Sequence, residues 1–217
     1  MSSYPTNLQN YYLYLPQLVP RPVWPGIAEV ATHKRWPEYH RGCGKVSSQN
    51  SLLILGAGQY GVMAAEIAES MGVFNRIAFL DDSLGENVVG TLNDLPKFAA
   101  EFRYGFVAIG NPALRRKLTE QLQQNGFTPA TLVHPTAYVS PSAQLETGCC
   151  VEPNATVQTG AVIKLASFIA SGAVIRHNAT VGDFCHIDCN AVVETGAVVP
   201  AKTKISCNAV FRKEQNS

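Results

Sequence analysis

The sequence predicts a small α/β domain with a parallel sheet, followed by a parallel β-helix. Three observations predict this architecture. The last third of the 217-residue chain repeats every six residues. A glycine-rich turn follows an apolar run near residue 55, and between these two features apolar runs alternate with helical patterns, as in a parallel sheet with helices on its faces. We expect an N-terminal arm over residues 1–50, the α/β domain over 51–133 and the β-helix over 134–217.

Residues 1–50 are rich in proline. They hold six of the 13 prolines and both tryptophans of the chain. Proline at this density disfavours helices and central strands. We expect an irregular arm that lies over the folded body, with a lid or an oligomer contact as the alternative.

The α/β domain begins with a strand over residues 52–55, and the glycines that follow match the pattern G-x-G-x-x-G with Gly56, Gly58 and Gly61. A helix follows them, and a second strand over 77–80 ends at Asp81. Such a turn lets backbone N–H groups at a helix N-terminus approach a phosphate, and an acidic residue after the second strand can reach a ribose or base. The pattern predicts a Rossmann-like domain.

The alternation continues with a helix near residues 95–102, a strand over 106–109, a helix from about residue 113 and a last strand over 131–133. Ligands of such sheets bind at the carboxyl ends of the strands. Because the domain is only half the size of a full dinucleotide fold, we expect a mononucleotide and not NAD. The alternative is that the domain is a structural cap on the β-helix.

Residues 136–213 keep one six-residue register throughout. The fourth place of each block is bulky and apolar, and the second place is small. The fourth-place residues are Val139, Leu145, Val151, Val157, Ile163, Ile169, Ile175, Val181, Ile187, Val193, Val199, Ile205 and Phe211. Neither a helix nor an alternating strand keeps period six, which indicates a parallel β-helix with the bulky residues inside.

Composition narrows the possible functions. A net charge of +1 gives no reason to expect nucleic acid or a membrane surface as partner. The six cysteines do not form a spaced disulfide framework, so we interpret them as reduced packing residues of a cytoplasmic protein. The repeat points Cys185 inward and places Cys189 at a corner, and we therefore expect no metal site from this pair.

The combination of glycine turn, a strand ending in Asp81-Asp82, Val-His-Pro and a six-residue repeat resembles the sugar O/N-acetyltransferase family. That family includes sialic acid O-acetyltransferases and bacterial nucleotide-amino-sugar N-acetyltransferases. The similarity covers about residues 51–213. The resemblance implies a left-handed β-helix, a homotrimer and acetyl-CoA as the donor.

Residues 174–186 resemble the catalytic stretch of that family. By resemblance His177 is the general base, and His186 lies near the acetyl group or pantetheine of acetyl-CoA. Asn178 stands where the family often has an acidic residue. An asparagine can orient an imidazole but supplies no charge to stabilise an imidazolium.

We expect direct acetyl transfer from acetyl-CoA to a nucleotide-linked amino sugar, with UDP as the nucleotide, in bacterial glycan synthesis. Gly56, Gly58, Gly61 and Asp81 would hold the nucleotide, with Asn111 and Arg115 near its phosphates or base. One alternative is O-acetylation of a sialic acid or another sugar hydroxyl. The other is a non-catalytic trimeric scaffold that binds nucleotide.

Overall fold

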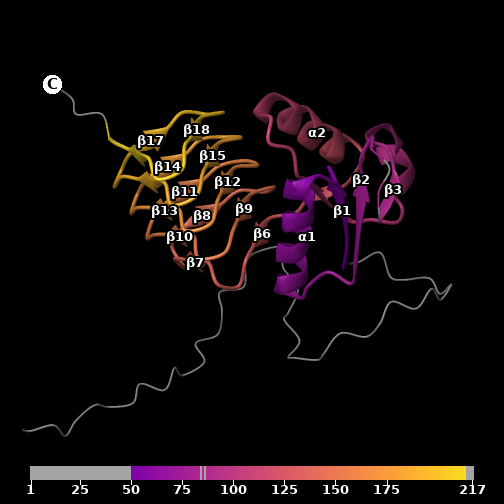
Figure 1. Cartoon of the computed structure of the whole chain (residues 1–217), viewed down its shortest axis with the longest axis horizontal. Helices are drawn as coiled ribbons and strands as arrows, with labels where there is room; N and C mark the ends of the chain where they lie inside the picture. Colours follow the sequence, from indigo (N-terminus) through magenta and orange to yellow (C-terminus); the bar gives the residue numbers. More distant parts are fainter. Residues whose placement is uncertain (1–49, 84, 86, 214–217) are drawn as a thin grey trace, which may run out of the picture.

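The computed structural model describes residues 50–83, 85 and 87–213. An α/β domain and a β-helix lie side by side (Figure 1). Almost all of the predicted N-terminal arm lies outside the described residues. Within the described part of the chain, no helix combines the length and apolar character needed to cross a bilayer.

The α/β domain is a parallel sheet of five strands in the order β3-β2-β1-β4-β5. Its helices are α1 (Gln59–Met71), η2 (Leu92–Phe98, a 3-10 helix) and α2 (Pro112–Gln124). Its strands are β1 (Ser51–Leu55), β2 (Arg76–Leu80), β3 (Val88–Gly90), β4 (Tyr104–Val107) and β5 (Thr128–Pro129). The strand order reverses direction at β1 and β4, so the crevice at their carboxyl ends is the expected ligand position.

Two predicted elements of this domain differ from the structure. The expected helix over 95–102 is instead η2, which starts after a capping box of Thr91 and Asp94 and contains Pro96. The expected last strand over 131–133 is β6 (Leu132–Val133), and it pairs with β9 of the β-helix instead of the α/β sheet. The β-helix therefore starts before residue 134, because Leu132 and Val133 already follow its six-residue register.

The β-helix consists of two-residue strands stacked in three parallel sheets, consistent with the left-handed β-helix of the family. Sheet I contains β6, β9 (Cys150–Val151), β12 (Phe168–Ile169), β15 (His186–Ile187) and β18 (Lys204–Ile205). Sheet II contains β7 (Tyr138–Val139), β10 (Thr156–Val157), β13 (Val174–Ile175), β16 (Val192–Val193) and β19 (Val210–Phe211). Sheet III contains β8 (Gln144–Leu145), β11 (Val162–Ile163), β14 (Thr180–Val181) and β17 (Val198–Val199). We name the corners after the sheets they join, in chain order: I–II, II–III and III–I.

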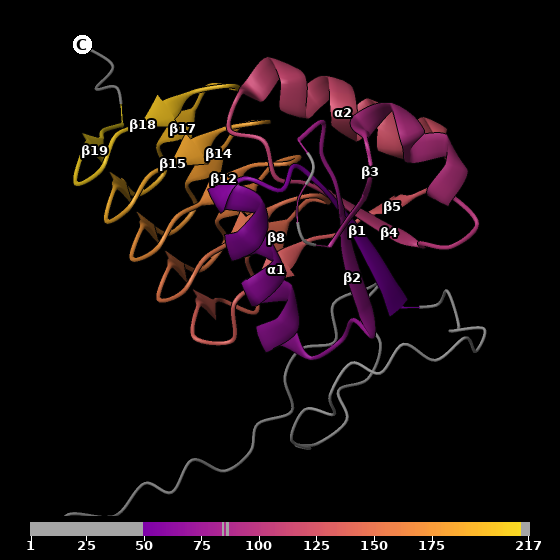
Figure 2. The same cartoon turned by 45° about the vertical axis from the view of Figure 1, so that its right-hand side comes forward.

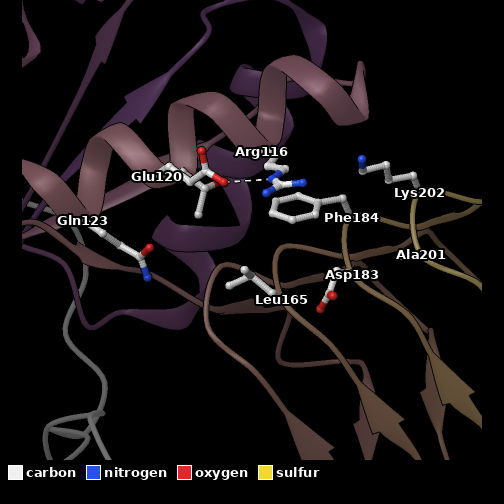
Figure 3. A pocket seen from close by; sticks show the side chains of 9 residues that line it. Arg116, Glu120, Gln123, Leu165, Asp183, Phe184, Ala201 and Lys202 are labelled. Carbon is white, nitrogen blue, oxygen red and sulfur yellow. Dashed lines mark hydrogen bonds and ion pairs between the residues drawn. The ribbon is translucent and has the colours of Figure 1, made fainter.

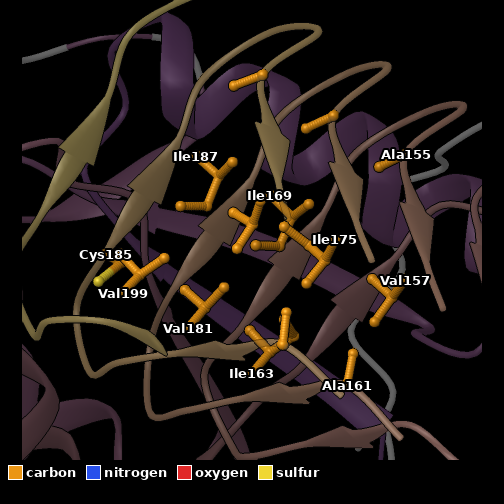
Figure 4. Packing of buried hydrophobic residues seen from close by; sticks show 14 of the residues in the cluster. Ala155, Val157, Ala161, Ile163, Ile169, Ile175, Val181, Cys185, Ile187 and Val199 are labelled. Carbon is orange, nitrogen blue, oxygen red and sulfur yellow. The ribbon is translucent and has the colours of Figure 1, made fainter. Parts of the chain in front are cut away.

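The predicted interior of the β-helix is confirmed. The fourth-place residues from Val151 to Val199 are at most 1% exposed, and they meet along the axis of the prism (Figure 4). The second-place residues from Ala143 to Ala197 are likewise buried. The core is thus one continuous apolar column, which only the stacking of coils can bury.

From residue 148 onward, each corner turns through a residue with positive φ at the first place of its block. These residues are Gly148, Asn154, Gly160, Ala166, Gly172, Asn178, Phe184, Asn190, Gly196, Lys202 and Asn208. Glycine and asparagine adopt this left-handed conformation at low cost, whereas other residues are strained in it. The recurring glycine or asparagine is a sequence signal for the corners that the apolar periodicity alone does not use.

The α/β domain docks on sheet I. Helix α1 lies against β6, and the third-place residues Leu132, Cys150 and Phe168 of sheet I share one apolar core with the buried face of α1. Figure 2 shows α1 along this side of the β-helix and α2 at its upper end. Sheet I is therefore the covered face of the prism.

Candidate functional site

The glycine turn forms an open N-terminus on α1. Gly56 has a φ of +103°, and a Cβ on Gly61 would lie 2.0 Å from the carbonyl oxygen of Gly56, so both positions require glycine. The N-cap residue Gly58 offers no side chain, and a Cβ built on it meets nothing within 4 Å. Helix α1 thus begins without a side-chain cap, and an uncapped helix N-terminus after a glycine turn is the kind of position where a phosphate can bind.

Asp81 lies against this turn, as its spacing predicts. Its Oδ2 accepts a hydrogen bond from the Ala57 N–H at 2.7 Å, and its Oδ1 accepts one from the Ser83 N–H at 2.7 Å. The bonds from Ala57 and then Ser83 hold the pKa of Asp81 below its usual range. An ionised carboxylate therefore fixes the glycine turn from the end of β2.

Asn111 lies after β4, at the same edge of the sheet. Its Oδ1 accepts hydrogen bonds from the N–H groups of Ala113 and Leu114, both at 3.0 Å, and so caps α2. The side-chain oxygen of Asn111 is committed to the helix. The two helices thus differ, because α2 carries its own cap whereas α1 does not.

Arg115 is not placed for the predicted contact with a nucleotide. It is fully buried, and its five N–H groups all meet backbone carbonyls. These are the carbonyls of Ala166 (3.0 Å), Ile109 (2.8 Å), Gly110 (3.0 Å), Phe184 (2.6 Å) and Cys185 (3.3 Å). The guanidinium also lies 4.2 Å from the ring centre of Phe168. Arg115 bridges the two domains and has no donor left for a phosphate.

His186 lies beside the glycine turn. Its ring packs edge-on against Tyr60, with centroids 5.7 Å apart, and against Phe168 at 6.1 Å. Burial lowers the pKa of His186, so its imidazole is neutral at pH 7. Tyr60 belongs to the glycine motif itself, so the packing connects His186 to the glycine turn.

His177 lies exposed at the II–III corner, directly after β13. Its carbonyl oxygen accepts a hydrogen bond from the Gly196 N–H at 3.0 Å, which anchors the corner to the next coil. The imidazole is thus carried by rigid backbone and presented to the outside.

Asn178 follows His177 at the positive-φ place, with a φ of +57°. Its N–H donates to the carbonyl of Thr159 at 3.0 Å. Asparagine adopts this left-handed backbone conformation more readily than most residues. The geometry of the turn therefore accounts for an asparagine at this position. Its expected part in orienting His177 stays a prediction.

The predicted site residues form two groups. The glycine turn, Asp81, Asn111 and His186 lie on the side of sheet I, where α1 docks. His177 lies on the corner between sheets II and III, which is the edge of the prism opposite sheet I. One copy of the chain therefore does not bring its own His177 to its own nucleotide edge.

Three residues that the sequence reasoning missed connect the domains. The ring of Tyr60 stacks on Phe168 with centroids 4.9 Å apart, and its hydroxyl donates to Glu152 Oε1 at 3.1 Å. Glu152 is 5% exposed, and its Oε2 also accepts bonds from the N–H and hydroxyl of Ser171. One sequence signal could have predicted this contact. Phe168 is an aromatic residue at a third place, which faces outward from the β-helix, and such a residue indicates that another part of the protein covers this face.

A pocket of about 400 Å³ lies between α2 and the III–I corner (Figure 3). Arg116, Glu120, Asp183 and Lys202 line it with both charge signs, and Arg116 already pairs with Glu120 at 2.8 Å. It contains none of the predicted site residues. The pocket therefore adds nothing to the candidate nucleotide site.

Comparison with known proteins agrees with these two domains. Residues 51–122 match the PglD N-terminal domain family. A GDP-perosamine N-acetyltransferase from Escherichia coli is 27% identical over 141 residues, which cover 60% of this chain. The match spans 64% of the length of that relative.

Solved structures share the fold. The acetyltransferase domain of PglB from Neisseria gonorrhoeae is 29% identical with a TM-score of 0.65, over 76% of this chain and 92% of the other. A histidine-to-asparagine variant of perosamine N-acetyltransferase from Caulobacter crescentus, in complex with CoA and GDP-perosamine, has a TM-score of 0.66 at 24% identity, over 76% and 90% of the two chains. The family match covers the α/β domain, and the solved structures share the combination of this domain with the β-helix.

Proposed function

We propose that the protein transfers the acetyl group of acetyl-CoA to the amine of a nucleotide-linked amino sugar. The observation that carries this proposal is the presence, in one chain, of an uncapped glycine turn at the α1 N-terminus and an exposed histidine on a β-helix corner. The first suits a nucleotide phosphate. The second suits proton transfer.

His177 acts as the general base in this proposal. The amine nitrogen attacks the thioester carbonyl carbon, His177 accepts the proton that the amine loses, and the C–S bond breaks to release CoA as a thiol. Holding amine and thioester together supplies the rest of the rate gain. A thiol nucleophile is disfavoured for the buried cysteines, because burial raises the pKa of Cys149 to about 12 and also raises that of Cys150.

The site is shared between copies of the chain. His177 and the nucleotide edge lie on opposite sides of one β-helix, so a second copy supplies the missing half. The outward faces of sheets II and III carry apolar third-place side chains, among them Val174, Val192 and the 66%-exposed Val198. Packing of these faces in a homotrimer would place the II–III corner of one copy near His186 of the next.

The nucleotide part of the substrate is the part for which two bases are candidates. From the sequence we expect UDP, whereas the curated relative is named for GDP-perosamine. Asp81 binds Ala57 through one oxygen and Ser83 through the other, so it shapes the turn that a base or ribose would meet. We propose a nucleoside diphosphate amino sugar as the substrate, and the assay below distinguishes the two bases.

We also propose a cytoplasmic location. Acetyl-CoA as the donor and free cysteines within the described residues are consistent with it.

The test is thiol release from acetyl-CoA with a panel of UDP- and GDP-linked amino sugars. Matched nucleotide sugars that carry a hydroxyl in place of the amine are the controls. We expect release with an amino sugar and none with its hydroxyl partner. Release with the hydroxyl sugars alone would contradict N-acetylation and favour O-acetylation. Binding of CoA and nucleotide without turnover would instead favour the scaffold.

A further inference from the structure

Asp188, Cys189 and Cys207 form a cluster on the I–II corner. One oxygen of Asp188 and the two Sγ atoms all lie within 4.8 Å of one another. Asp188 and Cys189 are half-buried and Cys207 is exposed. Neither thiol is used in the proposed transfer reaction.

The period of the β-helix brings the two thiols together. Cys207 occupies the same place as Cys189 three blocks later, so it lies directly above it on the next coil. The N–H of Asn208 donates to the carbonyl of Cys189 at 3.0 Å, which fixes the spacing of the two coils at this corner. The thiols are therefore positioned by rigid backbone, not by flexible loops.

We propose that this cluster binds a thiophilic divalent cation, of which zinc is the representative. Two thiolates and one carboxylate oxygen are ligands that Zn²⁺ prefers, and three such atoms within 4.8 Å of one another can surround one cation at bond lengths of about 2.0–2.3 Å. Water completes the fourth position on the exposed side. The cation would fasten the coil that contains β18 and β19, which has no further coil stacked on it within the described residues.

A cation at this cluster would compete with Lys204 for the carboxylate of Asp188. Its Oδ1 accepts a hydrogen bond from the Cys189 N–H at 2.9 Å, and its Oδ2 lies 3.4 Å from Lys204 Nζ. A cation on this carboxylate would displace the ammonium group of Lys204. Removing the lysine charge should therefore strengthen metal binding, which a purely structural ion pair does not predict.

The same geometry explains why Cys185 takes no part. Its side chain is buried on the inner side of the corner, and its thiol contacts the carbonyl of Pro200 at 3.0 Å. Cys185 is buried inside the β-helix and Cys189 lies half-buried at a corner, as the repeat predicts. The partner of Cys189 lies one coil away, where local spacing does not reveal it.

The experiment is equilibrium binding of Zn²⁺ to the full chain under a non-chelating reductant, with Co²⁺ absorption as a report of the ligands. We expect one tight site per chain and a thiolate-to-cobalt charge-transfer band. Cys189→Ser and Cys207→Ser should each weaken binding by at least about tenfold, since changing a residue that only hydrogen-bonds to a metal ligand already costs about 10–100-fold in affinity. Lys204→Gln should bind more tightly than the unaltered chain.

The matched control is Cys185→Ala, which removes a thiol from the same coil and inserts the residue that most second places already hold. It should bind Zn²⁺ as the unaltered chain does. Equal affinity in the Cys189→Ser, Cys207→Ser double variant would overturn the proposal. So would a cobalt spectrum without a thiolate band, which would mean oxygen ligands elsewhere.

Discussion

Two corners of the same β-helix solve one backbone problem in different ways. At the II–III corner the positive-φ places hold Gly160, Asn178 and Gly196. At the III–I corner they hold Gly148 and then three residues that are neither glycine nor asparagine, Ala166, Phe184 and Lys202, although Phe184 has nearly the same φ, +55°, as Asn178 with +57°. A left-handed conformation costs an ordinary L-residue about 1–2 kcal/mol, so the second corner is strained and the first is not.

Arg115 offsets that strain. Its guanidinium binds the carbonyls of Ala166 and Phe184 at the III–I corner, and the Phe184 side chain is 6% exposed. The strained corner is thus held by domain docking, whereas the relaxed II–III corner is left uncovered and carries His177. The difference teaches that the corner held by domain docking and the corner that exposes His177 are separate edges of the prism.

The largest expected effect is at the docking corner. Arg115→Met would remove the guanidinium donor from five backbone carbonyls, of which that of Cys185 keeps a backbone bond from Phe168, and should lower the free energy of unfolding by about 3 kcal/mol. Burial already lowers the pKa of Arg115 to about 10, yet it stays charged at pH 7. Chemical denaturation measures the change. Arg116→Met, which removes the neighbouring exposed arginine, is the control and should leave stability unchanged; equal effects of the two would refute the docking role.

Two glycines of the glycine turn are expected to have different roles, Gly61 in stability and Gly58 in nucleotide binding. A methyl group on Gly61 meets the Gly56 carbonyl, so Gly61→Ala should cost about 1–3 kcal/mol of stability. A methyl group on Gly58 meets open space, so Gly58→Ala should keep the melting temperature and weaken nucleotide binding by about tenfold. Calorimetric titration with UDP and GDP checks the second effect. Unchanged affinity in Gly58→Ala would remove the phosphate from this turn.

The uncovered corner can be tested at Asn178. Asn178→Ala should lose about 1 kcal/mol through backbone strain, whereas Asn178→Gly should keep the stability of the corner. If Asn178 also orients His177, then Asn178→Gly lowers kcat without a change in stability. Denaturation and turnover measured on both variants separate the two roles. Full stability in Asn178→Ala would show that the corner does not depend on this residue.

The smallest expected effect is the pH dependence that His186 contributes. Because burial depresses its folded pKa below the ordinary value of about 6.5, the unfolded chain binds the proton first as pH falls. The stability from neutral His186 is therefore present above about pH 6.5 and is lost as pH falls through the folded pKa. His186→Gln should flatten this decline in denaturation curves recorded across that range. An unaltered slope would contradict the burial of the imidazole.

The sequence predicts the core of the β-helix because the period is set by packing. Val157, Ile163 and Ile169 lie inside since no other arrangement buries every sixth residue. The glycine turn and Asp81 were predictable for a similar reason, because the spacing of strand, turn and strand fixes where they meet. Both predictions depend only on the six-residue repeat and on the order of neighbouring elements along the chain.

The role of Arg115 could not be predicted in the same way. Its five acceptors come from the loop after β4 and from two separate coils, a combination that only the docked domains create. The separation of His177 from the glycine turn was likewise hidden, because the two motifs are separate in the sequence and neither shows which edge of the prism it occupies. Assignments that depend on contacts between domains need the three-dimensional structure.

The central claim is that one active site needs two copies of the chain. The direct measurement is subunit complementation, in which a His177→Ala chain is co-expressed with a Gly58→Glu chain whose carboxylate repels the phosphate. Each variant alone should be inactive in thiol release. The account predicts that mixed assemblies, verified by native mass, recover a measurable part of the activity because an intact His177 meets an intact glycine turn. Mixed assemblies that remain inactive would contradict it.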